Sequence, residues 1–444
     1  MASGGNLSGV EPKAVGTLPY ACGMTTWIAF ISLVTAVAAV LGAWENHRAL
    51  RAARRRVDAL EHLVGGADEG GAAGGRNGVA AGKEAEAGPV VVIYNPVKVT
   101  DLGALRHTVE AVSAAANLPH VEWLETSVDD PGAGQARRAV AMGASRVIAA
   151  GGDGTVRVVG GVLAGTGIPL GIVPAGTGNL LGLNLGLPAG LEEQVATAVT
   201  GRPWAIDVGW IEAVEEPADT VQTERLRRRV QKIRRRAAEI GVPEPEAGGS
   251  FSGREPFLVI GGLGFDARIM AETDSDLKRR VGWVAYVMTG LRNLRGESMR
   301  ATVTLGMNAH GPAYAAESGR TGSAREAGAG QGRYRSILFA NCGTLPTGLA
   351  LVPDARIDDG WLDVGTMRVR GGLLGWVELA RQVLVRAVGG RTRARDLASL
   401  RFRRTKSARV DTEEFEPIEA DGDVLGFARS VRVSVDPSAL VVMS

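Results

Sequence analysis

Residues 146–155, RVIAAGGDGT, decide the fold. The first five residues form a short and largely apolar run, which is typical of a strand covered on both faces of its sheet. A glycine-rich loop, GGDGT, follows directly, and the spacing of apolar residues over 156–164 predicts a helix. This order of strand, loop and helix predicts a parallel α/β sheet with the loop at the carboxyl end of a strand.

The same alternation extends on both sides of this stretch. Apolar runs at residues 90–94, 121–125 and 170–173 predict three further strands. Apolar residues at helical spacing predict one helix that begins after Asp101, a residue type suited to an N-cap, and another over 135–142. An α/β domain over 89–205 accounts for the whole pattern.

Beyond residue 205 the pattern changes to strands with few helices. This predicts a second, mainly antiparallel β-rich domain over 206–444, whose last strand, 439–443, is suited to return to the first domain. The predicted strands are 257–260, 301–305, 336–340, 361–367 and 431–435, and the clearest helix is 281–294. Two insertions interrupt the domain, near 215–250 and 316–333.

The N-terminal part predicts a membrane anchor. Residues 21–44 are apolar and uncharged, and a spanning helix needs about 20 such residues. Five arginines follow at Arg48, Arg51 and 54–56, so the positive-inside rule predicts a cytoplasmic location for everything after Trp44. A buried soluble helix and a cleaved signal peptide stay open as alternatives. Residues 1–20 form a tail, and 45–88 form a basic segment and flexible linker.

The two insertions differ in composition. Residues 224–239 hold eight Arg or Lys residues, with Leu226 and Val230 on one helical face. A solvated basic helix and a helix in contact with anionic lipid both fit this pattern. Residues 318–332 are rich in Gly, Ser and Ala, which predicts a disordered hairpin loop.

Composition excludes several classes of protein. A net charge of +2 argues against a dedicated nucleic-acid binder. Two cysteines, Cys22 and Cys342, are too few for a disulfide scaffold or a cysteine-based zinc site. None of the five histidines has the spacing of a helical zinc motif.

Three loops at carboxyl ends of the predicted strands carry the chemistry. They are residues 95–96, 151–155 and 174–179. Ligands of parallel α/β sheets bind at this edge, where glycines let the backbone approach a phosphate and a helix N-terminus offers N–H groups. The spacings match neither the Walker nor the Rossmann fingerprint.

Asp153 is unusual among these glycines, because a carboxylate would repel a phosphate. It is suited to organise Mg²⁺ or to deprotonate an attacking hydroxyl. A helix-capping role is the alternative.

In combination, GGDGT at 151–155 and PAGTGN at 174–179 resemble the diacylglycerol kinase catalytic-domain family. This family includes bacterial lipid kinases and the sphingosine and ceramide kinases, with NAD kinases as more distant relatives. Four further segments are similar to family motifs: NP at 95–96, GLGFDA at 262–267, DGWLD at 359–363 and DGD at 421–423. The resemblance covers about residues 89–444.

The resemblance implies a NAD kinase-like α/β nucleotide-binding domain, a β-rich domain, and transfer of the γ-phosphoryl group of ATP to a lipid hydroxyl. Carried over by position, it places around ATP the residues Asn95, Thr126, Gly151, Gly152, Asp153, Gly154, Thr155, Gly176, Thr177, Gly178 and Asn179. Asp153 and Asp423 are the implied catalytic residues, and Asp266 would meet the lipid head group. Asp359, with the backbone carbonyls of Arg356 and Trp361, matches a Mg²⁺ position.

Four residues in three motifs depart from the family pattern. Arg157 and Val158 replace an Asn-Glu pair, Leu180 replaces an acid, and Asp423 replaces a glutamate.

We therefore expect a single-pass protein of the cell membrane whose cytoplasmic domains phosphorylate a lipid, with diacylglycerol as the first candidate. The expected partners are the lipid and an anionic membrane surface, with no nucleic acid, and a homodimer is allowed. The alternatives are a kinase for a sphingoid base or polyprenol, a non-catalytic ATP- or lipid-binding protein, and a soluble-substrate kinase.

Overall fold

A computed structural model describes residues 88–214, 250–264, 298–306, 330–344, 355–370 and 398–444, with separate residues among 224–231 and 374–382 and at 352. The predicted span 21–44, the predicted helix 281–294 and Asp266 lie outside the described residues. Within the described part, no helix is both long and apolar enough to cross a membrane.

The first half of the described chain is an α/β unit with a parallel sheet in the order β4-β3-β1-β2. Its strands are β1 (Val90–Tyr94), β2 (Val121–Glu125), β3 (Arg146–Gly151) and β4 (Leu170–Pro174). Its helices are α2 (Leu102–Ala115), α3 (Ala133–Ala141), α4 (Asp153–Leu163), α5 (Leu180–Leu185) and α6 (Leu191–Thr200).

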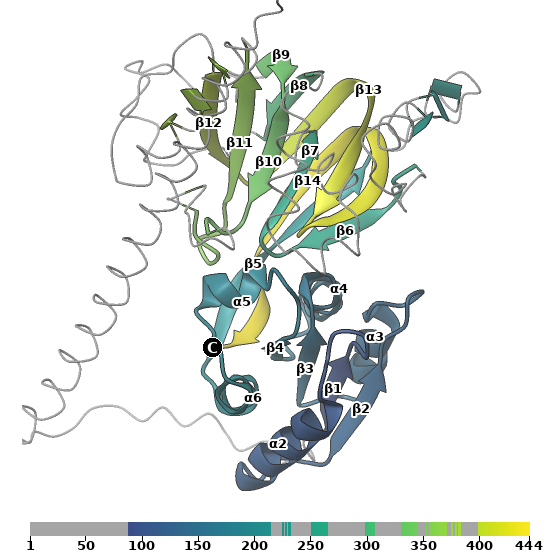
Figure 1. Cartoon of the computed structure of the whole chain (residues 1–444), viewed down its shortest axis with the longest axis vertical. Helices are drawn as coiled ribbons and strands as arrows, with labels where there is room; N and C mark the ends of the chain where they lie inside the picture. The colour runs from purple at the N-terminus through teal and green to yellow at the C-terminus, as the bar shows by residue number, and fades with distance from the viewer. Residues whose placement is uncertain are drawn as a thin grey trace, which may run out of the picture. The chain divides into compact units, whose positions relative to one another are not determined.

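Helices cover both faces of this sheet (Figure 1). On one face, α2 and α6 pack against alternate strand residues such as Val90 and Ile148. On the other face, α3 and α4 pack against the intervening residues, such as Val91 and Val147. Burial of both faces explains why the strands are continuous apolar runs.

The second half is built from ten strands that pair antiparallel to one another. They are β5 (Pro203–Ala213), β6 (Arg254–Phe257), β7 (Ile260–Gly264), β8 (Met299–Leu305), β9 (Gly330–Tyr334), β10 (Ser336–Ala340), β11 (Leu362–Val369), β12 (Ala398–Thr405), β13 (Ser407–Ala420) and β14 (Asp423–Met443). Alternate residues of these strands, including Ile337, Val410 and Val431, form a separate core. The predicted fold class, an α/β domain followed by a β-rich domain, is thus confirmed.

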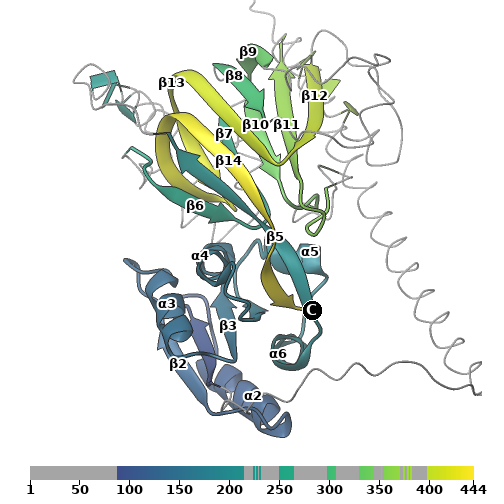
Figure 2. The same cartoon turned by 180° about the vertical axis from the view of Figure 1, so that it is seen from behind.

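Strand β14 belongs to both halves of the described chain. It pairs antiparallel with β13 and β5, and at Val442 it pairs in parallel with Leu170 of β4. In both views the C-terminal part of β14 lies beside β5 (Figure 2), where residues 435–443 pair with residues 203–209. The predicted strands 431–435 and 439–443 are therefore parts of one strand, with a register shift between Asp436 and Leu440.

Several predicted boundaries are wrong. The predicted strand 257–260 is instead the junction between β6 and β7. The backbone N–H groups of residues 258–260 donate hydrogen bonds to the Asp421 carboxylate. Helix α4 begins at Asp153, before the predicted start at 156. Residues 330–332 of the predicted loop 318–332 pair with β8 as part of β9, and β5 crosses the domain boundary predicted at 205/206.

Other local predictions are confirmed. The carboxylate of Asp101 accepts a hydrogen bond from Ala104 N at 2.8 Å and thereby caps α2. The described residues of the basic insertion 224–239 are helical, and Val230 packs on Phe427 and Phe415.

A glycine in β5 provides a test of the second core. The ring of Phe257 is fully buried and lies across Gly209, so that a Cβ added at Gly209 would overlap the ring. We predict that Gly209→Ala lowers the free energy of unfolding by about 1–3 kcal/mol, the usual cost of overpacking. Chemical denaturation measures the change. The matched control is Gly103→Ala in the exposed first turn of α2, which should not destabilise the protein. Equal effects at the two positions would contradict this account.

Candidate active site

Two glycine loops face each other at the carboxyl ends of β3 and β4. A Cβ added to Gly176 would lie only 2.7 Å from Gly152 Cα, so the two backbones approach as closely as glycine allows. Asn179 holds the second loop closed, since its side chain accepts from Gly176 N and donates to Gly176 O, both at 2.8 Å. Asn179 itself has a left-handed φ of 47°. The loops therefore form one continuous, glycine-lined backbone surface.

Asp153 ties these two loops together. Its carboxylate accepts hydrogen bonds from Asn179 N at 2.9 Å and from Leu180 N at 2.6 Å. Burial raises the pKa of this carboxyl, while these N–H groups lower it. Asp153 is thus not the N-cap of α4, which is Gly152; it instead satisfies the first N–H groups of α5.

The remaining predicted nucleotide residues lie around the same edge of the sheet. The N-cap of α4 has no side-chain hydrogen bond, which leaves the first N–H groups of this helix available to an anion. Asn95 ends β1, and its side chain accepts from Val97 N at 3.0 Å. Thr126 and Thr155 are only 4% and 3% exposed, so as placed here they support the loops from inside.

Asp423 reaches the glycine loop from the second half of the chain. A Cβ on Gly154 would lie 2.6 Å from its Oδ2, so only glycine at this position lets the carboxylate come so close. Its side chain is 46% exposed, and the same Oδ2 accepts from Arg157 Nη2 at 3.3 Å. The two predicted catalytic carboxylates, Asp153 and Asp423, therefore flank one loop.

Arg157 lies beneath this carboxylate and is the buried cation of the site. Its side chain is 7% exposed and pairs with Glu255 at 3.1 Å as well as with Asp423. It also donates to Pro256 O at 3.4 Å. The departure from the family's asparagine thus replaces a neutral amide with a charge that two carboxylates balance.

Asp421, two residues before Asp423, is buried. Its carboxylate accepts from Leu258 N at 2.7 Å, Val259 N at 2.9 Å and Ile260 N at 2.8 Å. Asp421 has a φ of 47°, and the following turn brings Asp423 to the glycine loop. These three bonds also explain why residues 258–260 form a junction between strands rather than a strand.

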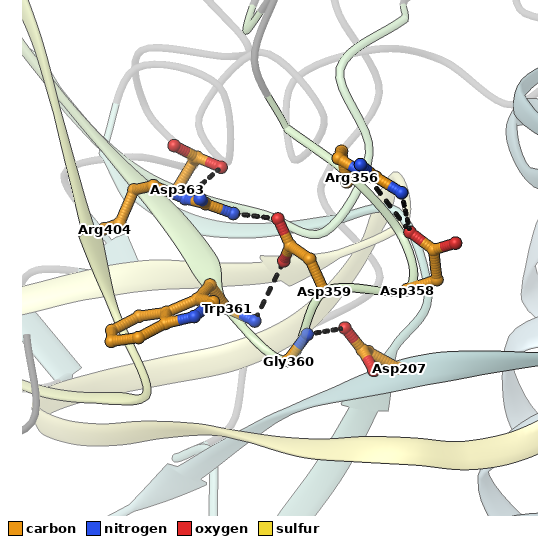
Figure 3. A network of polar contacts seen from close by, with 8 residues as sticks. All are labelled: Asp207, Arg356, Asp358, Asp359, Gly360, Trp361, Asp363 and Arg404. Atoms are coloured by element: carbon orange, nitrogen blue, oxygen red, sulfur yellow. Dashed lines mark hydrogen bonds and ion pairs between the residues drawn. The ribbon is translucent and has the colours of Figure 1, made fainter. Parts of the chain in front are cut away.

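A second acidic group surrounds the DGWLD motif (Figure 3). Asp359 forms an ion pair with Arg404 and accepts from Trp361 N at 3.1 Å. Asp207 is fully buried and accepts from Gly360 N at 2.6 Å and Ser438 N at 2.7 Å, and burial raises its pKa.

These residues do not fit the predicted Mg²⁺ position. The carboxylate of Asp359 already has a cationic partner in Arg404, and Lys406 lies over the Trp361 ring nearby. Among the described residues, no three acidic, histidine or cysteine side chains gather as a metal site. We therefore derive no catalytic step through a metal held at Asp359.

Two family models match the two halves of this fold. Residues 89–211 match the diacylglycerol kinase catalytic domain, and residues 260–444 match the YegS C-terminal NAD kinase beta sandwich-like domain. The predicted resemblance to the diacylglycerol kinase catalytic-domain family is thus confirmed over these residues.

Named relatives agree with this assignment. A Xanthomonas axonopodis pv. citri protein named "Probable lipid kinase YegS-like" is 29% identical over 266 residues, which cover 60% of this chain and 68% of the relative. A Pseudomonas aeruginosa protein of the same name is 30% identical over 188 residues, and the match spans about half of its length (52%) and 42% of this chain. A crystal structure of a diacylglycerol kinase from Bacillus anthracis shares the fold, with a TM-score of 0.53 at 18% identity, and covers 81% of this chain and 98% of that chain.

Sequence reasoning missed three contributors to the site. Asp421 lies in the DGD motif, but the motif predicts no role for it. Arg157 is predicted only as a departure from the family pattern, and Glu255 belongs to no motif. A basic residue at a helical position that faces a core, as Arg157 does after GGDGT, is itself a signal, because a buried charge requires partners.

The burial of Asp421 predicts a pH dependence of stability. Burial raises its pKa from 3.8 to about 6 in the folded protein, against the opposing effect of its hydrogen bonds and of Arg157. A raised carboxyl pKa contributes stability below the unfolded value that is lost as pH rises through the folded value. Relative to Asp421→Asn, wild type should therefore lose about 3 kcal/mol of unfolding free energy between about pH 3 and pH 7.

Chemical denaturation of both proteins across this pH range measures the difference. The exposed Asp129→Asn is the control, for which the difference from wild type should stay constant. A constant difference for Asp421→Asn as well would show that Asp421 does not titrate in this range.

Proposed function

We propose that this protein is an ATP-dependent lipid kinase that transfers the γ-phosphoryl group to a lipid hydroxyl, with diacylglycerol as the first candidate acceptor. The observation that carries the proposal is the contact between the Gly152 and Gly176 loops, with Asp153 and Asp423 beside them. A bare glycine-lined backbone at the start of α4 is suited to phosphates, and an acidic side chain at its border is suited to an attacking hydroxyl.

In this mechanism the two loops bind the nucleotide. The N–H groups at the start of α4 and the backbone around Gly176 contact the phosphates, while Asn179 and Asp153 keep the loops in place. MgATP is the substrate, and its Mg²⁺ arrives with the phosphates and offsets their charge. Phosphoryl transfer depends mainly on such positioning and charge neutralisation.

The contacts favour Asp423 over Asp153 as the group that accepts the proton of the lipid hydroxyl. Both oxygens of Asp153 accept backbone N–H groups, whereas Oδ1 of Asp423 has no hydrogen bond within the described part of the chain. The Asp423 side chain is also half exposed and therefore open to a substrate. Arg157 holds its other oxygen and thus orients the free one. Asp153 then has a positioning role.

The identity of the lipid rests on the family alone. A sphingoid base or a polyprenol also offers a primary hydroxyl to the same carboxylate. Phosphate transfer from radiolabelled ATP to diacylglycerol, a sphingoid base and a polyprenol in mixed micelles, by the purified full-length protein, distinguishes these acceptors. Turnover with none of them would favour a non-catalytic ATP- or lipid-binding protein and overturn the proposal.

Variants of the two carboxylates separate their roles. We predict that Asp423→Ala lowers kcat by about 10²–10⁴-fold, the usual contribution of a positioned base, with ATP affinity little changed. Asp153→Asn should instead abolish transfer through weaker ATP binding, because an amide cannot accept from both Asn179 N and Leu180 N without presenting its own N–H groups. Steady-state kinetics and ATP titration measure both effects.

The matched control is Asp436→Ala, an exposed aspartate of the same strand whose partner is Arg254. It should retain wild-type kinetics. A loss below tenfold for Asp423→Ala would remove this residue from the catalytic group, and near-normal activity of Asp153→Asn would leave Asp153 with a capping role only.

We also propose that residues 21–44 anchor the protein in the cell membrane, with the kinase domains in the cytoplasm. An anchored enzyme meets an insoluble substrate at high effective concentration. The support is the uncharged apolar run and the five arginines that follow it. Protease should cleave the domains in inside-out vesicles and spare them in right-side-out vesicles; the reverse pattern would overturn the topology.

A further inference from the structure

A cavity of about 180 Å³ lies between two antiparallel ribbons of the β-rich half, β8–β9 and β11–β12. Its floor is apolar, since Val303, Leu305, Tyr334 and Val364 line it and are each less than a tenth exposed. It shares no residue with the glycine loops or with the group around Asp359.

Three arginines surround this apolar floor. Arg368 of β11 and Arg401 and Arg403 of β12 line the cavity. The strand register explains their grouping, because Arg403 pairs with Val364 and Arg401 with Thr366, on the face that bears Arg368 two residues further along β11. No acidic side chain lines the cavity among the residues that the structure describes.

The three guanidinium groups differ in how they are held. Arg368 is fixed, because it donates to the Tyr334 hydroxyl at 2.9 Å and stacks over that ring at 4.6 Å. Arg401 and Arg403 are exposed, and no side-chain partner is recorded for either in the described residues. Like charges on one face of the β11–β12 ribbon repel one another, so this grouping is unfavourable unless an anion balances it.

We propose that this cavity binds an anionic phospholipid, with the phosphate at Arg401 and Arg403 and an apolar part of the lipid on the floor. Guanidinium groups bind phosphate oxygens with paired hydrogen bonds, which favours a phosphate over a zwitterionic or neutral head group. A cavity of about 150 Å³ with apolar walls holds a benzene-sized molecule, so this one has room for roughly six carbons.

This site is separate from the proposed transfer reaction. The arginines lie on β11 and β12, whereas the nucleotide loops follow β3 and β4, and no step of the mechanism above uses them. Binding here would add a lipid contact on the β-rich half to the predicted N-terminal anchor. The inference therefore stands or fails independently of the kinase activity.

The test is calorimetric titration of the purified full-length protein with lipids below their critical micelle concentration, in the absence of ATP. The probes are dihexanoyl phosphatidic acid, dihexanoyl phosphatidylcholine and glycerol 3-phosphate. The variant is Arg401→Gln with Arg403→Gln, both exposed on a formed strand. The control is Arg137→Gln with Arg138→Gln, which removes the same charge from exposed positions of α3.

We expect wild type to bind dihexanoyl phosphatidic acid at least tenfold more tightly than either other probe. The β12 double variant should lose at least tenfold in that affinity, because it removes both guanidinium groups that pair with the phosphate. The α3 double variant should not lose affinity. Unchanged affinity in the β12 variant would overturn the proposal. So would equal binding of glycerol 3-phosphate, which would show a site for free phosphate, or of phosphatidylcholine, which would show that the arginines do not discriminate. Kinase assays of the β12 variant with diacylglycerol, expected to be near wild type, keep this result distinct from a failure of the proposed function.

Discussion

The arrangement of the candidate site depends on the ion pairs of one buried guanidinium group, that of Arg157. A charge with 7% of its side chain exposed is tolerated only with partners, and both of its acidic partners come from the other half of the chain, Glu255 from β6 and Asp423 from β14. Because Arg157 lies one turn into α4, these pairs fix the helix that begins at the GGDGT loop. The same pairs orient the carboxylate that borders the loop. The position of the phosphate-binding backbone and that of the acidic side chain are therefore set by one cation.

The parallel strands of the α/β half and its helices α2, α3 and α4 could be predicted because their signals are local, whereas α5 and α6 were not predicted. Strands buried on both faces are continuous apolar runs, and Asp101 caps α2 within its own turn. Strands β12 and β13 were missed because they are buried mainly on one face and alternate with charged residues, as Arg401 and Arg403 illustrate. The junction at residues 258–260 could not be predicted either, because the acceptor of its N–H groups, Asp421, lies far along the chain.

The candidate site also combines features that the local sequence predicts with features that depend on distant residues. The motifs predicted the glycine loops and both acidic side chains, since a carboxylate among glycines can be recognised directly in the sequence. The motifs did not predict which groups these acidic side chains contact, because those contacts depend on strand register and on segments that are distant in the sequence. The Asp153 carboxylate meets backbone N–H groups of another loop, and Asp359 meets Arg404 only because β11 and β12 pair as they do. A carboxylate in a motif thus identifies a position, but its neighbours decide whether it can bind a metal, accept a proton or hold two loops together.

The pairing of β14 with β4 has a consequence for biosynthesis. Val442 lies beside Leu170, so the parallel sheet that bears the glycine loops gains this neighbour only after the β-rich half that precedes Val442 has been synthesised. Long-range pairing of this kind is slow and leaves a strand edge exposed in the meantime. In the nascent α/β unit, the edge of β4 would therefore stay unpaired while the β-rich half is synthesised. During translation this open edge is a place where a chaperone would protect the chain from pairing with other strands.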